Sequence, residues 1–277
     1  MILTRVKALV AEANLDNPKG SLKKIEKYAR EHPVIDYLLK GTQTLEWIKK
    51  REEQAAENSW GYSLKKGLEE LRVNYSITNL ENIPNEGGTI YVANHPYGII
   101  DAMLMLGGLG EAVKKQGKDF KVVGGGFFKM IQGLEKELFL VHNSDSKYTN
   151  PFSGLKEIFH YLQQGGNLGI FPSGKTSGPK LKECKWNSGL ARLAQYSNYV
   201  VPMWFSGPDH GTTYNFLSRF FPSLKIALAF TEAWDKKGKH IELNIGKPIS
   251  REEIRGWGLE NTKLTQEIRK RAELLKR

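Results

Sequence analysis

The feature that most constrains this chain is the alternation of short apolar runs with helical stretches between Leu71 and Ser250. The apolar runs have the length, composition and flanking turn residues of strands, at residues 71–80, 89–96, 120–128, 167–174, 199–207, 224–234 and 240–249. Helical spacing of apolar residues fills residues 102–117, 151–166 and 185–197 and resumes after Ser250. Strands that alternate with helices predict an α/β fold, with a mostly parallel sheet flanked by helices on both faces.

The first 70 residues differ, because their apolar residues recur at helical spacing and no strand pattern is present. The stretch that opens at Pro33 places its apolar residues mostly on one broad side: Ile35, Leu38, Leu39, Leu45, Trp47 and Ile48. We therefore expect an N-terminal helical segment over residues 1–70 and an α/β domain over residues 71–277. The apolar stripe is expected to pack on the core, with membrane docking as the alternative.

Basic residues outnumber acidic ones, 41 to 30, so the chain carries a net charge of +11. Such a surplus favours an anionic partner, which can be nucleic acid, an acidic carrier protein or an anionic membrane surface. No signal peptide is evident, and no apolar run reaches the roughly 18 residues that span a bilayer. The expected location is therefore cytoplasmic, with any membrane contact peripheral and on the inner face.

Metal and disulfide chemistry have little support in the sequence. Cys184 is the only cysteine, which excludes an intrachain disulfide and a metal site built on cysteines. His142, His160 and His210 are too scattered to indicate a metal site. We expect no metal and no bound cofactor.

A nucleotide-binding interpretation arises at Gly169–Thr176, which spells the phosphate-loop pattern Gly-x-x-x-x-Gly-Lys-Thr. Such a loop needs a helix that opens at the Lys-Thr pair and backbone N–H groups that surround the phosphates. Pro172 removes one of those N–H groups, and Gly178 and Pro179 fall where the first helical turn would form. A phosphate-loop NTPase or kinase is therefore the third-ranked alternative.

A histidine and a carboxylate follow the apolar run 89–93, in the stretch "NHPYGIID". His95 could accept the proton of a weakly nucleophilic hydroxyl, and Asp101 could fix the tautomer of the imidazole and stabilise its protonated form. Gly98 gives the connection the backbone freedom to return Asp101 toward His95. The alternative is structural: His95 ends a strand and Asp101 caps the next helix.

Taken with "FPSG" at residues 171–174, the stretch "NHPYGIID" resembles the glycerophospholipid acyltransferase superfamily, whose best-known members are 1-acylglycerol-3-phosphate acyltransferases. "NLENIPNEGGTIYVANH" is similar to the family's lead-in and catalytic strand. "WNSGLARLAQYSNYVVPMWFSG" is similar to its helix and Val-x-Pro strand. The resemblance covers about Leu71 to Gly207, with the blocks in the family's order.

The resemblance implies an acyltransferase that moves a fatty acyl group from an acyl-CoA or acyl-carrier-protein thioester to a hydroxyl of a (lyso)phospholipid-type acceptor. His95 would be the general base and Asp101 its orienting carboxylate, with no covalent acyl-enzyme. Val201 and Pro202 would support the thioester-binding wall. The implied substrate-binding residues are Asn94, Gly98, Phe171, Pro172, Ser173, Gly174, Lys175 and Thr176.

Three departures leave the acceptor open. Five residues separate His95 from Asp101, where the family usually has four. The loop reads Phe-Pro-Ser-Gly-Lys-Thr-Ser, where Phe-Pro-Glu-Gly-Thr-Arg-Ser is typical, so Lys175 offers a point charge and no bidentate fork. The block at "FLVHNSDS" contains His142 and Asn143 but no arginine. The acceptor can therefore be a lysophospholipid diester, an amino-acid lipid or another hydroxylated amphiphile.

The rival from another class is a non-catalytic basic module that binds nucleic acid or an anionic membrane. It would use the lysines near the 171–174 loop: Lys175, Lys180, Lys182 and Lys185. The same lysines can attract the phosphates of CoA, the acidic residues of a carrier protein or anionic lipid. Since the resemblance favours the enzyme, no nucleic-acid partner is expected.

Overall fold

A computed structural model describes residues 26–27, 31, 33, 36–37, 40–141, 153–211, 214–215 and 225–277. At residues 127, 153–154, 179 and 225–229 it describes the backbone alone. Ile35, Leu38 and Leu39 of the predicted N-terminal stripe lie outside the described residues, as do His142 and Asn143.

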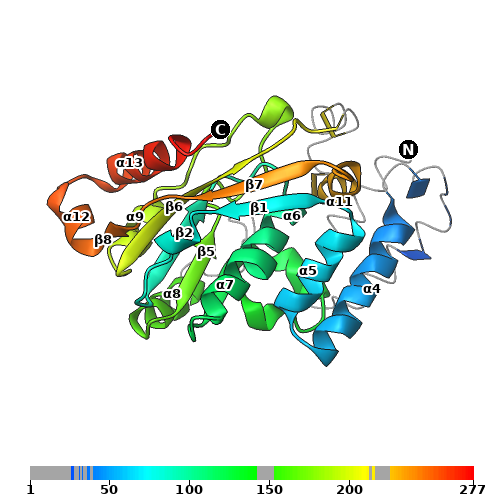
Figure 1. Cartoon of the computed structure of the whole chain (residues 1–277), viewed down its shortest axis with the longest axis horizontal. Coiled ribbons are helices and arrows are strands. Elements are labelled where there is room, and N and C mark those ends of the chain that lie inside the picture. The colour runs from blue at the N-terminus through cyan, green and yellow to red at the C-terminus, as the bar shows by residue number, and fades with distance from the viewer. Residues whose placement is uncertain are drawn as a thin grey trace.

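The core of the molecule is one eight-stranded sheet (Figure 1). Seven strands lie in the order β1-β7-β6-β2-β5-β3-β4, and β8 pairs with β6 off this path. Their bounds are β1 Asn74–Thr78, β2 Thr89–Ala93, β3 Phe120–Gly125, β4 Leu138–Val141, β5 Asn167–Ile170, β6 Tyr199–Ser206, β7 His240–Ile245 and β8 Ile249–Ser250.

The pairing confirms the mostly parallel sheet. β2 pairs in parallel with β5 on one side and β6 on the other, and β3 and β4 continue the parallel arrangement beyond β5. The direction reverses where β7 and β8 pair antiparallel with β6, and β1 runs parallel to β7. Because β2 lies in the middle of the sheet, every residue of it is buried, and the residue after it is held on a rigid base.

One face of the sheet is covered by helices from the N-terminal part of the chain. Helices α4 (Gly41–Glu57) and α5 (Trp60–Glu70) form a hairpin, in which Ser59 caps α5 by accepting a hydrogen bond from the Tyr62 N–H. Ile48 joins the same hydrophobic cluster as the strands. The described part of the predicted apolar stripe therefore packs on the core.

A continuous helical rod crosses the same face. It comprises α6 (Ile99–Met103), the π-helix η2 (Leu104–Gly110) and α7 (Glu111–Lys114). Gly107 and Gly108 let the rod approach its neighbours closely, since a Cβ on Gly108 would lie 2.7 Å from Ile77 Cδ1. Figure 1 shows this rod beside α5, with α4 on the far side of α5.

The opposite face carries a second hydrophobic cluster. Its helices are α8 (Ser153–Gln163), α9 (Gly189–Ala194), α12 (Arg251–Gly256) and α13 (Asn261–Glu273). Short 3-10 turns complete the described fold: η1 Leu80–Asn82, η3 Gly126–Met130, η4 Leu134–Glu137 and η5 Pro179–Leu181. None of the helices in the described ranges is long and apolar enough to cross a membrane.

One element prediction was wrong, and one strand was not predicted. The run 224–234, predicted as a strand, forms the helix α11 (Lys225–Asp235), whose residues Phe230 and Ala233 join the first hydrophobic cluster. An apolar run of this length fits both a strand and a buried helix, and periodicity alone does not separate them. The strand β4, which is short and lies at the edge of the sheet, was not predicted.

Candidate active site

His95 stands just beyond the carboxyl end of β2, where Asn94 anchors the chain. The Asn94 side chain mimics a strand pairing with β6: its Nδ2 donates to the Phe205 carbonyl oxygen at 2.9 Å, and its Oδ1 accepts from the Phe205 N–H at 2.7 Å. Asn94 is buried, so its amide holds the strand end that carries His95. A direct contact between Asn94 and a substrate stays a prediction.

The turn after His95 brings Asp101 back to it. His95 Nδ1 lies 3.0 Å from Asp101 Oδ2, which also accepts the Tyr97 N–H at 2.7 Å. Gly98, with φ 62° and ψ −106°, adopts a backbone conformation that favours glycine directly before α6. The predicted His–Asp pair is therefore assembled by a glycine turn and the first turn of a helix.

Burial separates the two partners. The Asp101 side chain is fully buried, whereas 17% of the His95 side chain is exposed. Burial raises the pKa of Asp101, and the hydrogen bonds from His95 and the Tyr97 N–H act in the opposite direction. With Oδ2 accepting at Nδ1, the tautomer that places its proton on Nδ1 leaves Nε2 as the basic nitrogen.

The predicted 171–174 loop lies against the imidazole. It follows β5, the neighbour of β2, and both strands end at the same edge of the sheet. The Phe171 ring stacks on the His95 ring, with 4.0 Å between centroids and 14° between planes. The structure therefore brings together the two predicted stretches, "NHPYGIID" and "FPSG".

Backbone hydrogen bonds fix the shape of this loop. The Gly174 N–H donates to the Phe171 carbonyl oxygen at 2.9 Å, with Gly174 at φ 59°. The Ser177 N–H donates to the His95 carbonyl oxygen at 2.7 Å. The loop thus both closes on itself and binds the turn that carries His95.

Beyond this loop the chain does not form a phosphate loop. No helix opens at Lys175 and Thr176; a hairpin-like turn follows, in which the Gly178 N–H donates to the Lys182 carbonyl oxygen at 2.9 Å. Glu183 closes the turn by accepting from Ser177 Oγ at 2.7 Å and from Trp186 Nε1 at 3.0 Å. The helix N-terminus that a phosphate loop requires is therefore not present at Lys175 and Thr176.

The predicted lysine cluster lies on this turn. All four of its members are exposed, and none makes an ion pair with a described residue: Lys175, Lys180, Lys182 and Lys185. They give the rim of the site an uncompensated positive charge. An anionic group of a substrate would therefore be attracted to the 171–185 side of His95.

Two other predicted residues lie deeper. Val201 and Pro202 are buried in β6 and pair with Tyr91 and Val92 of β2, so they support the strand that carries His95. Their part in a thioester-binding wall stays a prediction. Within the described ranges, no group of three His, Cys, Asp or Glu side chains could hold a metal ion.

Sequence reasoning missed three residues that organise the site. These are Tyr97, through its N–H, together with Ser177 and Glu183. No residue pattern marks them, because two act through the backbone and Glu183 acts within an irregular turn.

Residues 74–206 match the family model described as Acyltransferase, and this range contains every predicted site residue. Among solved structures, the 1-acyl-sn-glycerophosphate (LPA) acyltransferase PlsC from Thermotoga maritima is 17% identical, with 99% of this chain and 98% of that chain covered and a TM-score of 0.48. No curated protein matches the sequence.

Proposed function

We propose that this chain, whose residues 74–206 match the Acyltransferase family model, is a member of the glycerophospholipid acyltransferase superfamily and acylates a hydroxyl of a lysophospholipid-type acceptor. The donor would be a thioester of CoA or of an acyl-carrier protein. The observation that carries this proposal is the His95–Asp101 pair, a partly exposed imidazole backed by a buried carboxylate beside the 171–174 loop.

In the proposed mechanism His95 acts as general base through Nε2. The acceptor hydroxyl oxygen attacks the thioester carbonyl carbon and forms a C–O bond, while its proton moves to Nε2. The tetrahedral intermediate then collapses, the C–S bond breaks, and the imidazolium returns the proton to the departing thiolate. Asp101 stabilises the imidazolium that exists between these two steps.

The 171–185 region would bind the polar parts of the substrates. Its four exposed lysines suit the phosphates of CoA, the acidic surface of a carrier protein or the head group of the acceptor. The Phe171 ring limits the tilt of the imidazole, which keeps Nε2 directed to one position.

The experiment uses purified protein, radiolabelled acyl-CoA or acyl-carrier protein, and a panel of lysophospholipids and other lyso-lipids. We expect a new acylated lipid with the natural chain and a loss of at least about 100-fold with His95→Ala. His160→Ala, which removes an exposed histidine of α8, is the matched control and should leave the rate unchanged. Near-normal acylation by His95→Ala would refute the mechanism.

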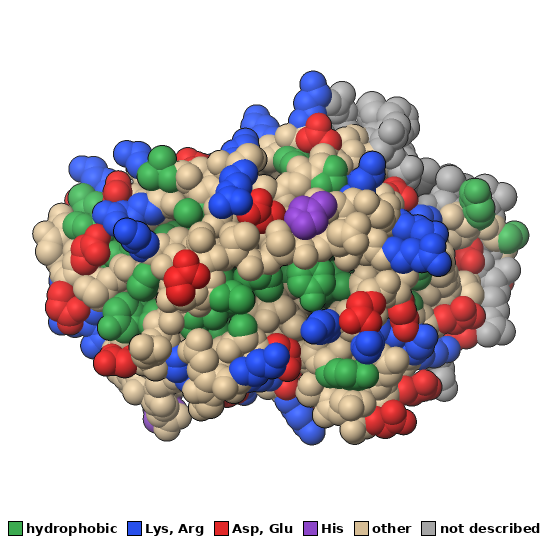
Figure 2. All heavy atoms as spheres, viewed as in Figure 1, with side chains coloured by type: hydrophobic (Ala, Val, Ile, Leu, Met, Phe, Trp, Pro, Cys, Tyr) green, Lys and Arg blue, Asp and Glu red, His purple; other side chains and the backbone are tan. Residues whose placement is uncertain are grey.

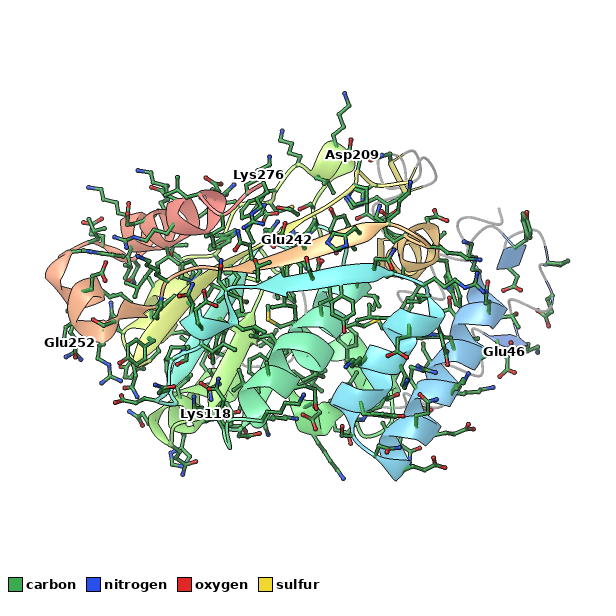
Figure 3. The ribbon with its side chains drawn as sticks, in the orientation of Figure 1. Glu46, Lys118, Asp209, Glu242, Glu252 and Lys276 are labelled. Carbon is green, nitrogen blue, oxygen red and sulfur yellow. The ribbon has the colours of Figure 1, made fainter. Side chains whose placement is uncertain are left out.

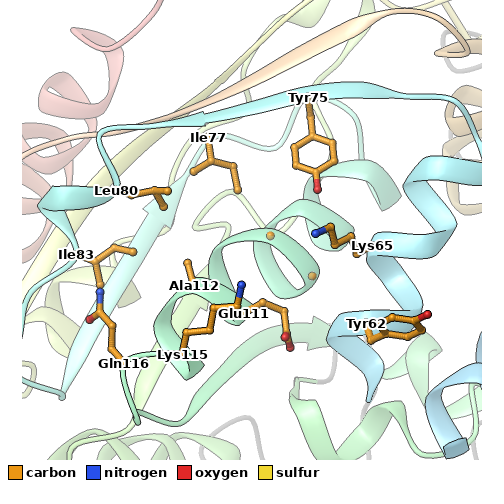
Figure 4. A pocket seen from close by; sticks show the side chains of 12 residues that line it. Tyr62, Lys65, Tyr75, Ile77, Leu80, Ile83, Glu111, Ala112, Lys115 and Gln116 are labelled. Carbon is orange, nitrogen blue, oxygen red and sulfur yellow. The ribbon is translucent and has the colours of Figure 1, made fainter. Parts of the chain in front are cut away.

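We also propose that one face of the protein meets an anionic membrane surface. A groove of about 570 Å³ runs between the edge strand β1 and the helical rod (Figure 4). Its lining includes Ile77, Leu80, Ile83 and Ala112. None of the predicted site residues line it. In Figure 2 hydrophobic side chains gather across the middle of this face, over the space between β1 and α7.

Charge and exposure favour an anionic lipid surface as the partner of this groove. Tyr62 and Leu80 at its sides are 42% and 43% exposed, so large apolar side chains border the groove at both of these places. Lys65 and Lys115 line the groove together with one carboxylate, that of Glu111, and neither lysine makes an ion pair with a described residue. In Figure 4 the Lys65 amino group points from α5 into the groove. Apolar contact with acyl chains and attraction to lipid phosphates would therefore act together.

A further inference from the structure

A second histidine–carboxylate pair lies buried behind the catalytic turn. His210 follows β6, Glu232 lies in α11, and Lys236 follows α11. Their side chains are 0%, 1% and 2% exposed, so none can meet a substrate directly. We refer to these three residues as the Glu232 cluster.

Glu232 is the centre of this cluster. Its Oε1 lies 3.0 Å from His210 Nδ1 and accepts a hydrogen bond from Lys236 Nζ, and its Oε2 accepts the Gly211 N–H at 3.1 Å. Lys236 Nζ also donates to the Asp209 carbonyl oxygen at 2.6 Å. Figure 3 labels the position of Asp209. Burial would raise the pKa of Glu232, but the hydrogen bonds from His210 and Lys236 hold it below its usual value.

The cluster reaches the catalytic turn through Tyr97. Lys236 Nζ lies 5.2 Å from the centroid of the Tyr97 ring, and the His210 ring meets that ring edge-on, with 6.3 Å between centroids. Tyr97 is fully buried and stands between His95 and Asp101 in the chain, where its N–H donates to Asp101. A shift of the Tyr97 ring would therefore move a donor of the catalytic carboxylate.

A second route runs through Tyr214 to the 171–177 loop. The Tyr214 ring stacks on His210, with 4.1 Å between centroids and 28° between planes. Its hydroxyl donates to the Ser177 carbonyl oxygen at 3.3 Å, and the Ser177 N–H donates to the His95 carbonyl oxygen. Both segments that flank the catalytic imidazole thus rest on the same buried cluster.

We infer that Glu232, His210 and Lys236 are positioning residues, which act through Tyr97 and Tyr214 to hold the His95–Asp101 pair and the 171–177 loop in register. The inference rests on the proposed function for its kinetic consequence, and on geometry alone for its structural consequence. A buried ionic cluster of this kind need not add stability, since its desolvation cost is large, and specifying one arrangement is the better-supported role.

The first test is kinetic. In Glu232→Gln we expect kcat to fall at least about tenfold, because small displacements of a general base are costly. KM for both substrates should stay within about twofold, since the cluster touches neither of them. Glu232→Asp, which keeps the charge, should recover part of the loss. Tyr214→Phe removes only the bond to Ser177 and serves if Glu232→Gln does not fold; it should show the same loss in kcat with KM unchanged.

Glu70→Gln is the matched control. Glu70, the last residue of α5, pairs with the buried Arg51 of α4, in an ionic contact that does not involve the catalytic turn. All of these variants are assayed below their melting temperatures. If Glu232→Gln and Tyr214→Phe lower stability as Glu70→Gln does but leave kcat unchanged, the cluster is a stabilising element only and the inference is overturned.

A second readout does not depend on acyl transfer. The Nδ1 proton of His95, bonded to Asp101, should give a downfield proton resonance that disappears in His95→Gln. We expect this resonance to shift or broaden in Glu232→Gln and Tyr214→Phe but not in Glu70→Gln. If it is unchanged in the first two variants, the inference fails even where the proposed reaction holds. If it changes in a protein without acyltransferase activity, the positioning role stands and the proposed function fails.

Discussion

At the scale of single residues, Asp101 carries an energetic conflict. One oxygen, Oδ2, accepts from both His95 and the Tyr97 N–H, while Oδ1 is buried without a partner. The fold thus keeps an incompletely bonded carboxylate where burial raises its pKa. The buried, incompletely bonded carboxylate lowers the stability of the fold, but its negative charge stabilises His95 when the imidazole becomes positively charged.

Asp101→Asn should therefore separate activity from stability. The Asn oxygen can still accept both donors, so the geometry is kept, but the imidazolium loses its counter-charge and kcat should fall by about 100-fold or more. Because burial raises the pKa of Asp101, its ionised form is disfavoured by the fold, so the stability that Asp101 contributes is present at low pH and lost as pH rises.

The melting temperature of Asp101→Asn should accordingly match that of the natural chain in acid and exceed it increasingly as pH rises toward neutrality. Calorimetry of both proteins across this range is the measurement. A variant that is less stable at neutral pH than the natural chain would show that the carboxylate is a net stabilising group here.

At the scale of elements, the pairing of β2 with β5 decides where the site forms. β2 and β5 are adjacent and parallel, so the stretches that follow them meet, and this much is predictable from alternating apolar runs. The prediction failed for α11, where an apolar run suited two kinds of element. Because the Glu232 cluster joins α11 to the segment after β6, it stayed invisible to a pattern that assigned the wrong element. Hydrogen bonds through backbone groups, such as that of Ser177, leave no mark in the sequence at all.

The turn at 171–174 gives a prediction at this scale. Gly174→Ala should cost about 1 kcal/mol of unfolding free energy, because φ at residue 174 is 59° and alanine disfavours that region. A Cβ there would meet nothing within 4 Å, so the cost is conformational and not steric. The displaced loop should also raise KM for the acceptor.

Gly125→Ala is the control for this change. A Cβ on Gly125 also meets nothing within 4 Å, but its φ of −71° suits any residue. Denaturant unfolding of both variants gives the comparison, and equal effects would contradict the argument from backbone conformation.

At the scale of the whole molecule, the net charge of +11 is unevenly compensated. Lys66 and Lys114 pair with Glu69 and Glu137, whereas their chain neighbours Lys65 and Lys115, which line the groove, have no acidic partner among the described residues. The contrast gives the proposed membrane face a test that holds the change in charge constant.

Lys65→Gln/Lys115→Gln should bind vesicles of phosphatidylglycerol and phosphatidylcholine at least about tenfold more weakly than the natural chain. Lys66→Gln/Lys114→Gln removes the same charge from the same elements and should change binding little. Flotation at low and high salt, with pure phosphatidylcholine vesicles as a second arm, is the measurement. Equal losses in the two double variants would point to general charge attraction, and would sink the assignment of this face. His95→Ala should bind as the natural chain does.

The stack of Phe171 on His95 has a kinetic consequence. With one side of the imidazole screened by the phenyl ring and Nδ1 engaged by Asp101, the nitrogen that remains can serve one hydroxyl at a time. No side chain in this mechanism stores the acyl group between donor departure and acceptor arrival. Initial-rate plots at varied concentrations of the thioester donor and the lipid acceptor should therefore intersect, the signature of a ternary complex.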